Sequence, residues 1–292
     1  MTRTRFTARR LLACAVLTAT LGLTAGCTDD PDQAQGGQHT NTGGGGLPSP
    51  HVHGIAVNPG DGAVYLASHD GLFRYGPTGP QRISPVIDLM GFTVAGADHF
   101  YASGHPGQGT DLPNPVGLIE STDAGQTWKA LSRQGQSDFH ALTASSTGMI
   151  AGYDGTLAIT TDRLSWEPRS ITAPPYALAT STDAAVLLAA TSTGLLRSTD
   201  AAQTWKPVPD APPLVLVDWA DTTVATGITD DGTIAVSTDT GLTWQRRGTA
   251  AQPQAIEAVP TTAGNLRIVI ATEKVVLDST DGGVTFGPLP NE

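Results

Sequence analysis

Short runs of apolar and small residues alternate with polar positions along most of this chain, and clusters of Gly, Ser, Thr, Asp and Pro separate the runs. The run Val186–Ala190, for example, ends at a turn, and Gly194–Arg197 forms the next run. Runs of this length between turn residues predict β-strands, and a sustained helical spacing of apolar residues is missing. We therefore expect an all-β fold with almost no helix.

A polar motif recurs along the chain with a regular spacing. Its full form is Ser-Thr-Asp, three variable residues including small ones, Thr or a close equivalent, and then Trp or Phe. Full copies lie at 121–128, 198–205, 237–244 and 279–286, and a shorter copy at 160–166. Successive copies begin 39, 38, 39 and 42 residues apart, which is about the length of a four-stranded propeller blade. Gly71–Arg74 aligns with Gly194–Arg197 and adds a first blade with a degenerate motif, so a six-bladed β-propeller is predicted over residues 51–292.

The acidic residue of each motif is predicted to stabilise its own turn. An Asp side chain accepts N–H bonds within a turn, and Gly tolerates positive φ there. Residues that repeat in every blade cannot all point at one site, and the aromatic residue that follows is expected to pack in the core. The turn carboxylates are Asp123, Asp162, Asp200, Asp239 and Asp281, and the aromatic residues include Trp128, Trp166, Trp205 and Trp244.

This motif resembles the Asp-box, or BNR, repeat of the sialidase-like β-propellers. Residues 51–292 look most like actinobacterial Asp-box lipoproteins classed as glycosyl hydrolases, through the stretches 51–54, 91–96, 101–106 and 137–142. The resemblance implies glycan hydrolysis, but the three arginines that hold a sialidase substrate have no counterpart at the starts of the first strands, so a true sialidase is not expected. More distant similarity to photosystem-assembly propellers and sortilin-type receptors implies protein binding.

The N-terminal residues 1–26 predict an export signal. Met1 to Arg10 contains four arginines and no acid, and Leu11–Leu23 is apolar but too short for a membrane span. Leu23–Cys27 is similar to a bacterial lipobox, so Cys27 is expected to be lipidated. Residues 27–50, with glycines at 43–46, are interpreted as the lipidated cysteine and a flexible linker. We expect an exported protein anchored to the outer face of the bacterial cell membrane, with Sec and twin-arginine export both open.

The charge of the chain argues against some classes of binding partner. The formal net charge is −11, and removal of the signal takes away four arginines and no acid. So acidic a surface argues against nucleic acid and against adsorption on anionic lipid, which leaves the lipid on Cys27 as the expected membrane contact. Cys27 is the only cysteine after residue 26, so no disulfide can form within that part of the chain.

Polar residues of the predicted first strands map to one rim of the ring. The alignment places His53, Met90, His140, Tyr176, Val217 and Ile256 at one position, with His51, Asp88 and Asp138 two residues earlier. Ends of second strands and the long loop 104–117 of blade 2 reach the same face, where propeller loops usually shape a site. We expect a ligand-binding rim on blades 1–3. Its residues are His51, His53, His69, Asp88, His105, Asp111, Asp138 and His140.

Three functions remain open at this rim. The first is binding of a protein or glycan ligand by an anchored propeller. The second is glycan hydrolysis, which needs two carboxylates; Asp88 and Asp138 come first, and Asp218 and Glu257 are the other candidates. The third is binding of Zn or Cu, because a His-x-His on a strand points both imidazoles to one face. The metal ligands would be His51, His53 and His140.

Overall fold

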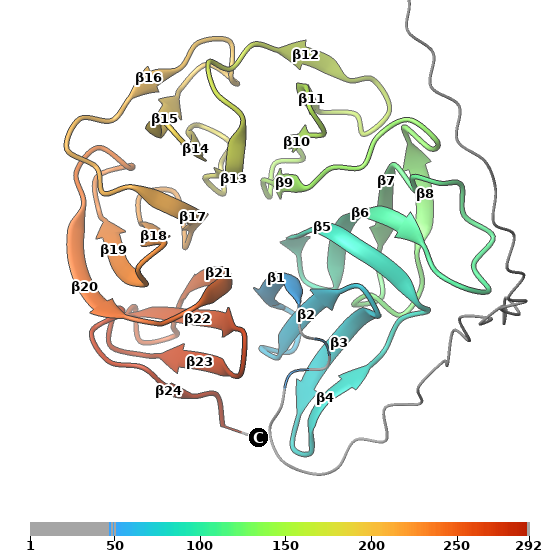
Figure 1. Cartoon of the computed structure of the whole chain (residues 1–292), viewed down its shortest axis with the longest axis horizontal. Coiled ribbons are helices and arrows are strands. Elements are labelled where there is room, and N and C mark those ends of the chain that lie inside the picture. The colour runs from blue at the N-terminus through green and yellow to red at the C-terminus, as the bar shows by residue number, and fades with distance from the viewer. Residues whose placement is uncertain (1–46, 48, 50, 291–292) are drawn as a thin grey trace, which may run out of the picture. The chain divides into compact units, whose positions relative to one another are not determined.

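The computed structural model describes residues 47, 49 and 51–290 and shows six four-stranded sheets around a central channel (Figure 1). Each sheet consists of four consecutive strands, so each is one blade and the chain runs once around the ring. The described residues contain no helix. The predicted all-β, six-bladed propeller is therefore confirmed. The predicted signal peptide, Cys27 and the linker through residue 46 lie outside the described residues.

The strands of each blade are named in chain order from the channel outward (Figure 1). The first strands are β1 (Val52–Val57), β5 (Ile87–Gly96), β9 (Ala141–Ala144), β13 (Pro175–Thr180), β17 (Leu214–Trp219) and β21 (Pro253–Pro260). The second strands are β2 (Val64–Ser68), β6 (His99–Pro106), β10 (Ile150–Tyr153), β14 (Leu187–Thr191), β18 (Ala225–Thr229) and β22 (Leu266–Thr272). The third strands are β3 (Gly71–Gly76), β7 (Leu118–Ser121), β11 (Leu157–Thr160), β15 (Gly194–Ser198), β19 (Thr233–Ser237) and β23 (Val276–Ser279). The outer strands are β4 (Gly79–Arg82), β8 (Lys129–Ser132), β12 (Glu167–Arg169), β16 (Lys206–Pro207), β20 (Gln245–Thr249) and β24 (Gly287–Pro288).

The repeated motif forms the turn between third and fourth strands, and its polar side chains bind that turn. In blade 2, the Ser121 hydroxyl donates to Asp123 Oδ1 at 2.8 Å and accepts the Gly125 N–H at 2.8 Å. Asp123 also accepts the N–H and the hydroxyl of Thr127, at 2.9 and 2.6 Å. The copies at 198–205, 237–244 and 279–286 repeat these bonds. The repeated carboxylates therefore hold turns and do not converge on a site.

The hydrophobic core is divided among the seams between neighbouring blades, with one cluster of buried side chains at each of the six seams. The half-buried Trp128, Trp166, Trp205 and Trp244 pack against four of these clusters. The seam between blades 6 and 1 closes the ring by side-chain packing, because neither sheet borrows a strand from the other. The Val52 N–H also donates to Gln254 Oε1 across this seam at 3.0 Å.

Candidate functional site

A β-bulge near the start of the first strand shapes the rim. In five blades the pairing with the second strand skips one residue at this place, and that residue lies outside the ladder. The bulged residues are His53, Met90, Tyr176, Val215 and Gln254. In blade 3, His140 directly precedes β9 at the corresponding place. Bulges redirect side chains and are common beside functional sites, so a bulge at His53 turns its imidazole out of the regular pleat.

The bulges correct the alignment made from the sequence. That alignment placed Val217 and Ile256 at the position of His53, whereas the structure places Val215 and Gln254 there. The sequence alignment of blades 5 and 6 was therefore wrong by two residues. As a result, Asp218 and Glu257 lie farther along their first strands than the sequence alignment implied.

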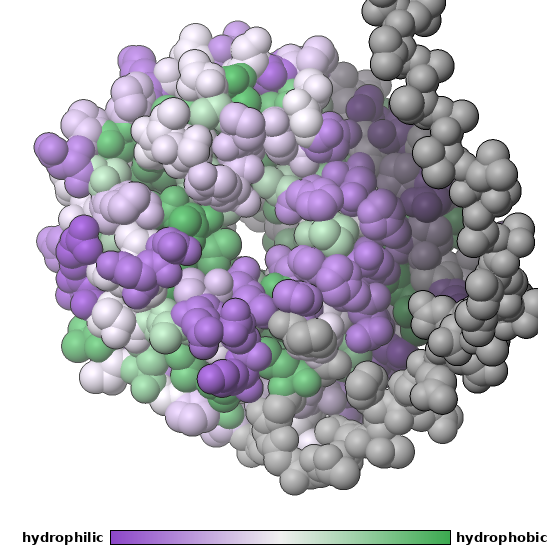
Figure 2. Space-filling view, in the orientation of Figure 1, coloured by the Kyte–Doolittle hydropathy of each residue, from purple (hydrophilic) through white to green (hydrophobic). Residues whose placement is uncertain are grey.

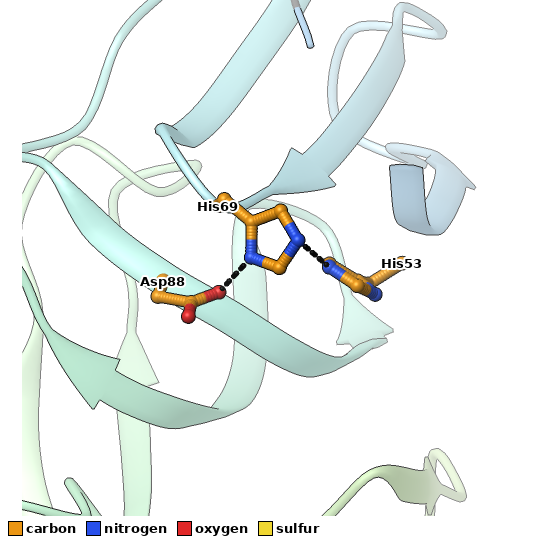
Figure 3. A group of neighbouring side chains, drawn as sticks. All are labelled: His53, His69 and Asp88. Carbon is orange, nitrogen blue, oxygen red and sulfur yellow. Dashed lines mark hydrogen bonds and ion pairs between the residues drawn. The ribbon is translucent and has the colours of Figure 1, made fainter. Parts of the chain in front are cut away.

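Three rim residues form a chain of hydrogen bonds between blades 1 and 2 (Figure 3). His69, which follows β2, lies between His53 on β1 and Asp88 on β5. Its Nδ1 is 2.8 Å from Asp88 Oδ1, and its Nε2 is 3.1 Å from His53 Nε2. When His69 is neutral, its Nδ1–H donates to the carboxylate and its Nε2 accepts the proton of His53 Nε2–H. Asp88 thereby selects the tautomer of His69.

A second chain of contacts lies between blades 2 and 3. Asp138 Oδ2 accepts from His140 Nε2 at 2.8 Å and lies 3.1 Å from His105 Nε2. The other ring nitrogen of His105 is 2.8 Å from Asn114 Oδ1 in the loop between β6 and β7. Asp138 Oδ1 is buried and has no hydrogen-bond partner among the described residues. This half of the rim therefore contains one buried carboxylate oxygen whose hydrogen-bonding capacity is unused within the described residues.

The two chains of contacts are joined by strand pairing. Asp88 on β5 lies directly opposite His105 on β6, and directly opposed residues of an antiparallel pair share one face of the sheet. The result is a continuous band that crosses blades 1 to 3, which we call the histidine–aspartate row. Its members are His53, His69, Asp88, His105, Asp138 and His140. Figure 2 shows an opening at the centre of the ring and hydrophilic residues to its right, in the region of β5 and β6.

The environment shifts the pKa values of two imidazoles in opposite directions. Burial, followed by the neighbouring His69, lowers the pKa of His53 and favours its neutral form. The pKa of His105 is raised, chiefly by its hydrogen bond to Asn114. Burial opposes this shift, and the negative charges of Asp138 and Asp88 add to it. Both nitrogens of His105 face oxygen atoms, so its protonated form can donate on each side.

The remaining predicted rim residues lie at the edge of the histidine–aspartate row or apart from it. The ring of His51 contacts that of His69 edge-on, with centroids 5.9 Å apart. Asp111 is exposed in the loop between β6 and β7 and takes no part in the contacts of the row. One residue of the predicted metal set, His140, binds Asp138. A different group brings its donor atoms within 4.8 Å of one another, and it consists of His53, His69 and Asp88.

A second polar feature lies toward the other ends of the first strands. The sequence indicated two of its residues, Asp218 and Glu257, as candidate carboxylates, but the bonds they make between blades were missed. Equivalent side chains accept an N–H from the next blade's first strand, and they are Thr93, Thr143, Asp218 and Glu257. Thr93 and Thr143 do so with hydroxyls at 3.2 and 3.1 Å, and Asp218 Oδ2 accepts the Ala258 N–H at 2.7 Å. These inter-blade bonds satisfy N–H groups at the inner edges of blades 1, 3, 4 and 6.

The two carboxylates of this feature line a cavity of about 650 Å³ at the channel. Burial raises the pKa of Asp218 to about 7, and burial together with the charge of Asp218 raises the pKa of Glu257. Both side chains are only partly accessible to the channel. Two carboxyl groups in such a place cannot both ionise easily, so the pair retains a proton near neutral pH.

Comparisons with known proteins support the fold. No family model and no curated protein matches the sequence. Among solved structures, the chain is similar to the GH74 xyloglucanase from Xanthomonas campestris, with a TM-score of 0.53 and 16% identity over 85% of this chain and 46% of that one. An ancestral GH74 enzyme gives 0.54 and 14% over 86% and 39%. YCF48 bound to D1 peptide gives 0.55 and 12% over 81% and 95%.

These similarities concern the fold and do not extend to function. The chain spans less than half the length of the two GH74 enzymes. Identities of 12–16% show a shared propeller fold and no more.

The described residues also include no helix with the length and apolar character of a membrane span.

Proposed function

We propose that this chain is a lipid-anchored Asp-box propeller that binds a protein or glycan partner at the histidine–aspartate row. The anchor is the lipid on Cys27, which holds the domain at the outer face of the cell membrane. The observation that supports binding is the joining of four imidazoles and two carboxylates from three blades into one row. A row that both donates and accepts hydrogen bonds suits a polar partner, and imidazoles can stack on its rings or sugars.

Similar propellers support a peptide or a glycan as the ligand class. The match to YCF48, whose structure contains a D1 peptide, covers 81% of this chain and 95% of that one. The two GH74 enzymes are larger, and the one from Xanthomonas campestris is a xyloglucanase. Because the row offers no apolar anchor of its own, the partner is expected to contribute hydrogen-bonding groups to the contact.

The row can be tested by photocrosslinking in intact cells that express the full chain. A photoreactive residue replaces His140, which is 60% exposed in the row. The matched control replaces Tyr176, which is 56% exposed at the corresponding place one blade further on. A discrete adduct from position 140 that Asp138→Asn weakens, with none from position 176, is the expected result. Equal labelling from both positions, or from neither, would remove the row as the binding surface.

The anchor has a separate test. Cys27→Ala should release the protein from the membrane fraction and abolish incorporation of a radiolabelled fatty acid. Labelling that persists in this variant would contradict lipidation at Cys27. Neither result bears on the row, so the two parts of the proposal stand or fall independently.

Glycan hydrolysis is the second candidate function, and Asp218 and Glu257 favour it over Asp88 and Asp138. A general acid must remain protonated near neutral pH, and burial gives Asp218 that property within a cavity. Asp88 and Asp138 instead each accept from imidazoles. Release of sugar from xyloglucan that Asp218→Asn or Glu257→Gln abolishes, and that Asp138→Asn leaves intact, would establish this function. An absence of product from a panel of surface glycans would argue against it.

A further inference from the structure

His53 and His69 hold two ring nitrogens in a geometry that suits a metal ion. The two Nε2 atoms are 3.1 Å apart. A tetrahedral ion with metal–nitrogen bonds of about 2.0–2.1 Å places two such nitrogens about 3.3 Å apart, which differs little from the observed distance. We propose that His53 and His69 bind one divalent transition-metal ion through these two atoms, with Asp88 as a positioning residue behind His69.

Asp88 occupies the place that an orienting carboxylate takes in metal sites. It accepts from Nδ1 of His69 at 2.8 Å (Figure 3), and this bond leaves Nε2 as the unprotonated ring nitrogen of neutral His69, 3.1 Å from Nε2 of His53. A carboxylate on the far nitrogen of a ligating imidazole fixes its tautomer and increases its basicity. Asp88 therefore acts through His69 and need not touch the ion.

The site is open enough for an ion to enter and for further ligands to join it. The His69 side chain is 44% exposed and that of Asp88 28%. The exposed His51 lies edge-on to His69, so a change of its rotamer would supply a third imidazole. The remaining positions would hold water or a group from the partner. Imidazole-rich sites favour Zn²⁺, Cu²⁺ and Ni²⁺ over Ca²⁺ and Mg²⁺, which prefer oxygen.

The other half of the row lacks this geometry and provides an internal control. His105 and His140 both direct Nε2 at Asp138 Oδ2, at 3.1 and 2.8 Å. Their nitrogens are thus directed at a shared acceptor, whereas the Nε2 atoms of His53 and His69 lie next to each other, 3.1 Å apart. Loss of His140 should leave ion binding unaffected.

The test uses the full-length lipidated chain in detergent, stripped with EDTA and titrated calorimetrically with Zn²⁺. One ion per chain is expected, and His69→Ala should weaken binding by at least about 100-fold. Asp88→Asn, which keeps the shape of the side chain, should weaken it by about 10–100-fold, and His140→Ala should leave it unchanged. Co²⁺ should give visible absorption typical of nitrogen ligands in the wild type and lose it in His69→Ala.

Three outcomes would overturn the site: no saturable Zn²⁺ binding, an affinity that His69→Ala leaves unchanged, or an equal loss in His140→Ala. Circular dichroism confirms that each variant is folded, so an unfolded protein is not mistaken for a lost ligand. The inference deepens the proposed function, because a bound ion would present open positions to the partner at the row. Crosslinking from position 140 in the presence of EDTA separates the two: an adduct that persists without metal preserves partner binding even when the metal site fails.

Discussion

Replacing Asp218 with Asn should make the propeller more stable at alkaline pH. Asp218 Oδ2 accepts the Ala258 N–H at 2.7 Å, and an asparagine oxygen can accept the same bond without carrying a charge. Burial raises the pKa of Asp218 to about 7, against about 3.9 in an unfolded chain. A carboxyl group whose folded pKa is the higher one stabilises the fold fully below about pH 4, and this contribution is lost as the pH rises through about 7.

The size of the effect follows from the two pKa values. Their difference corresponds to about 4 kcal/mol at 1.36 kcal/mol per pH unit, which is a ceiling. Both side chains are partly accessible from the channel, and Glu257 can take up part of the charge repulsion by retaining the proton itself. We therefore expect Asp218→Asn to increase the free energy of unfolding by about 1–3 kcal/mol at pH 8 and to change it little at pH 5.

Urea denaturation at pH 5 and pH 8 measures this difference directly. Asp218→Ala is the companion variant, because Ala56 and Ala179 occupy the equivalent position in blades 1 and 4. It removes the acceptor as well as the charge, so it should be less stable than Asp218→Asn by about 1 kcal/mol at both pH values. If Asp218→Asn is destabilised equally at pH 5 and pH 8, the carboxyl group is not strained by burial and the reasoning is wrong.

Three further predictions concern the turns and the core. Ser237→Ala leaves the buried Gly241 N–H without its acceptor and should cost about 1–3 kcal/mol, measured by urea denaturation. Bonds within the turns hold the pKa of Asp200 and of Asp239 at about 2, so their stabilising effect, present above about pH 4, should be lost between about pH 4 and 2. Thermal midpoints over this range should fall less in Asp200→Asn than in the wild type. Phe139→Ala empties a fully buried site stacked on a tryptophan ring at 4.7 Å and should cost about 3–5 kcal/mol, again by denaturation.

The number of blades and the position of the turns could be read from the sequence because the motif recurs with its bonding residues intact. Ser121, Asp123 and Thr127 each make a bond that needs that side chain, so the pattern survives in every full copy. The third strand of blade 1 was also predicted from Gly71–Arg74, and it forms part of β3. These features depend on bonds between residues close in sequence, and such bonds require particular residue types that can be recognised in the sequence.

The register of the first strands could not be read in the same way. The bulged positions contain His53, Met90, Tyr176, Val215 and Gln254, which share no residue type. A bulge needs one extra residue in the strand and places no common demand on its side chain here. The alignment therefore slipped in blades 5 and 6, where no histidine marked the position.

The composition of the rim was easier to predict than its connections. Histidines and aspartates of blades 1 to 3 were assigned to one face from their positions in the repeat. That Asp88 lies between His69 and His105 depends on the pairing of β5 with β6 and on the approach of β2. Distances between separate blades are set by packing at the seams, which leaves no simple pattern in the sequence.

The other blades of the ring show which polar residues the fold itself requires. At the inter-blade bonding position, Thr93 and Thr143 satisfy the next strand with neutral hydroxyls, while blades 5 and 6 use carboxylates whose burial opposes their ionisation. Threonine in blades 2 and 3 shows that an acid is unnecessary for this bond, so Asp218 and Glu257 are expected to weaken the fold at neutral pH without a structural need. Residues that depart from a repeat at a cost in stability are expected where function has selected them. The same comparison applies to the rim, because the bulge forms equally well with Val215 or Tyr176 as with His53.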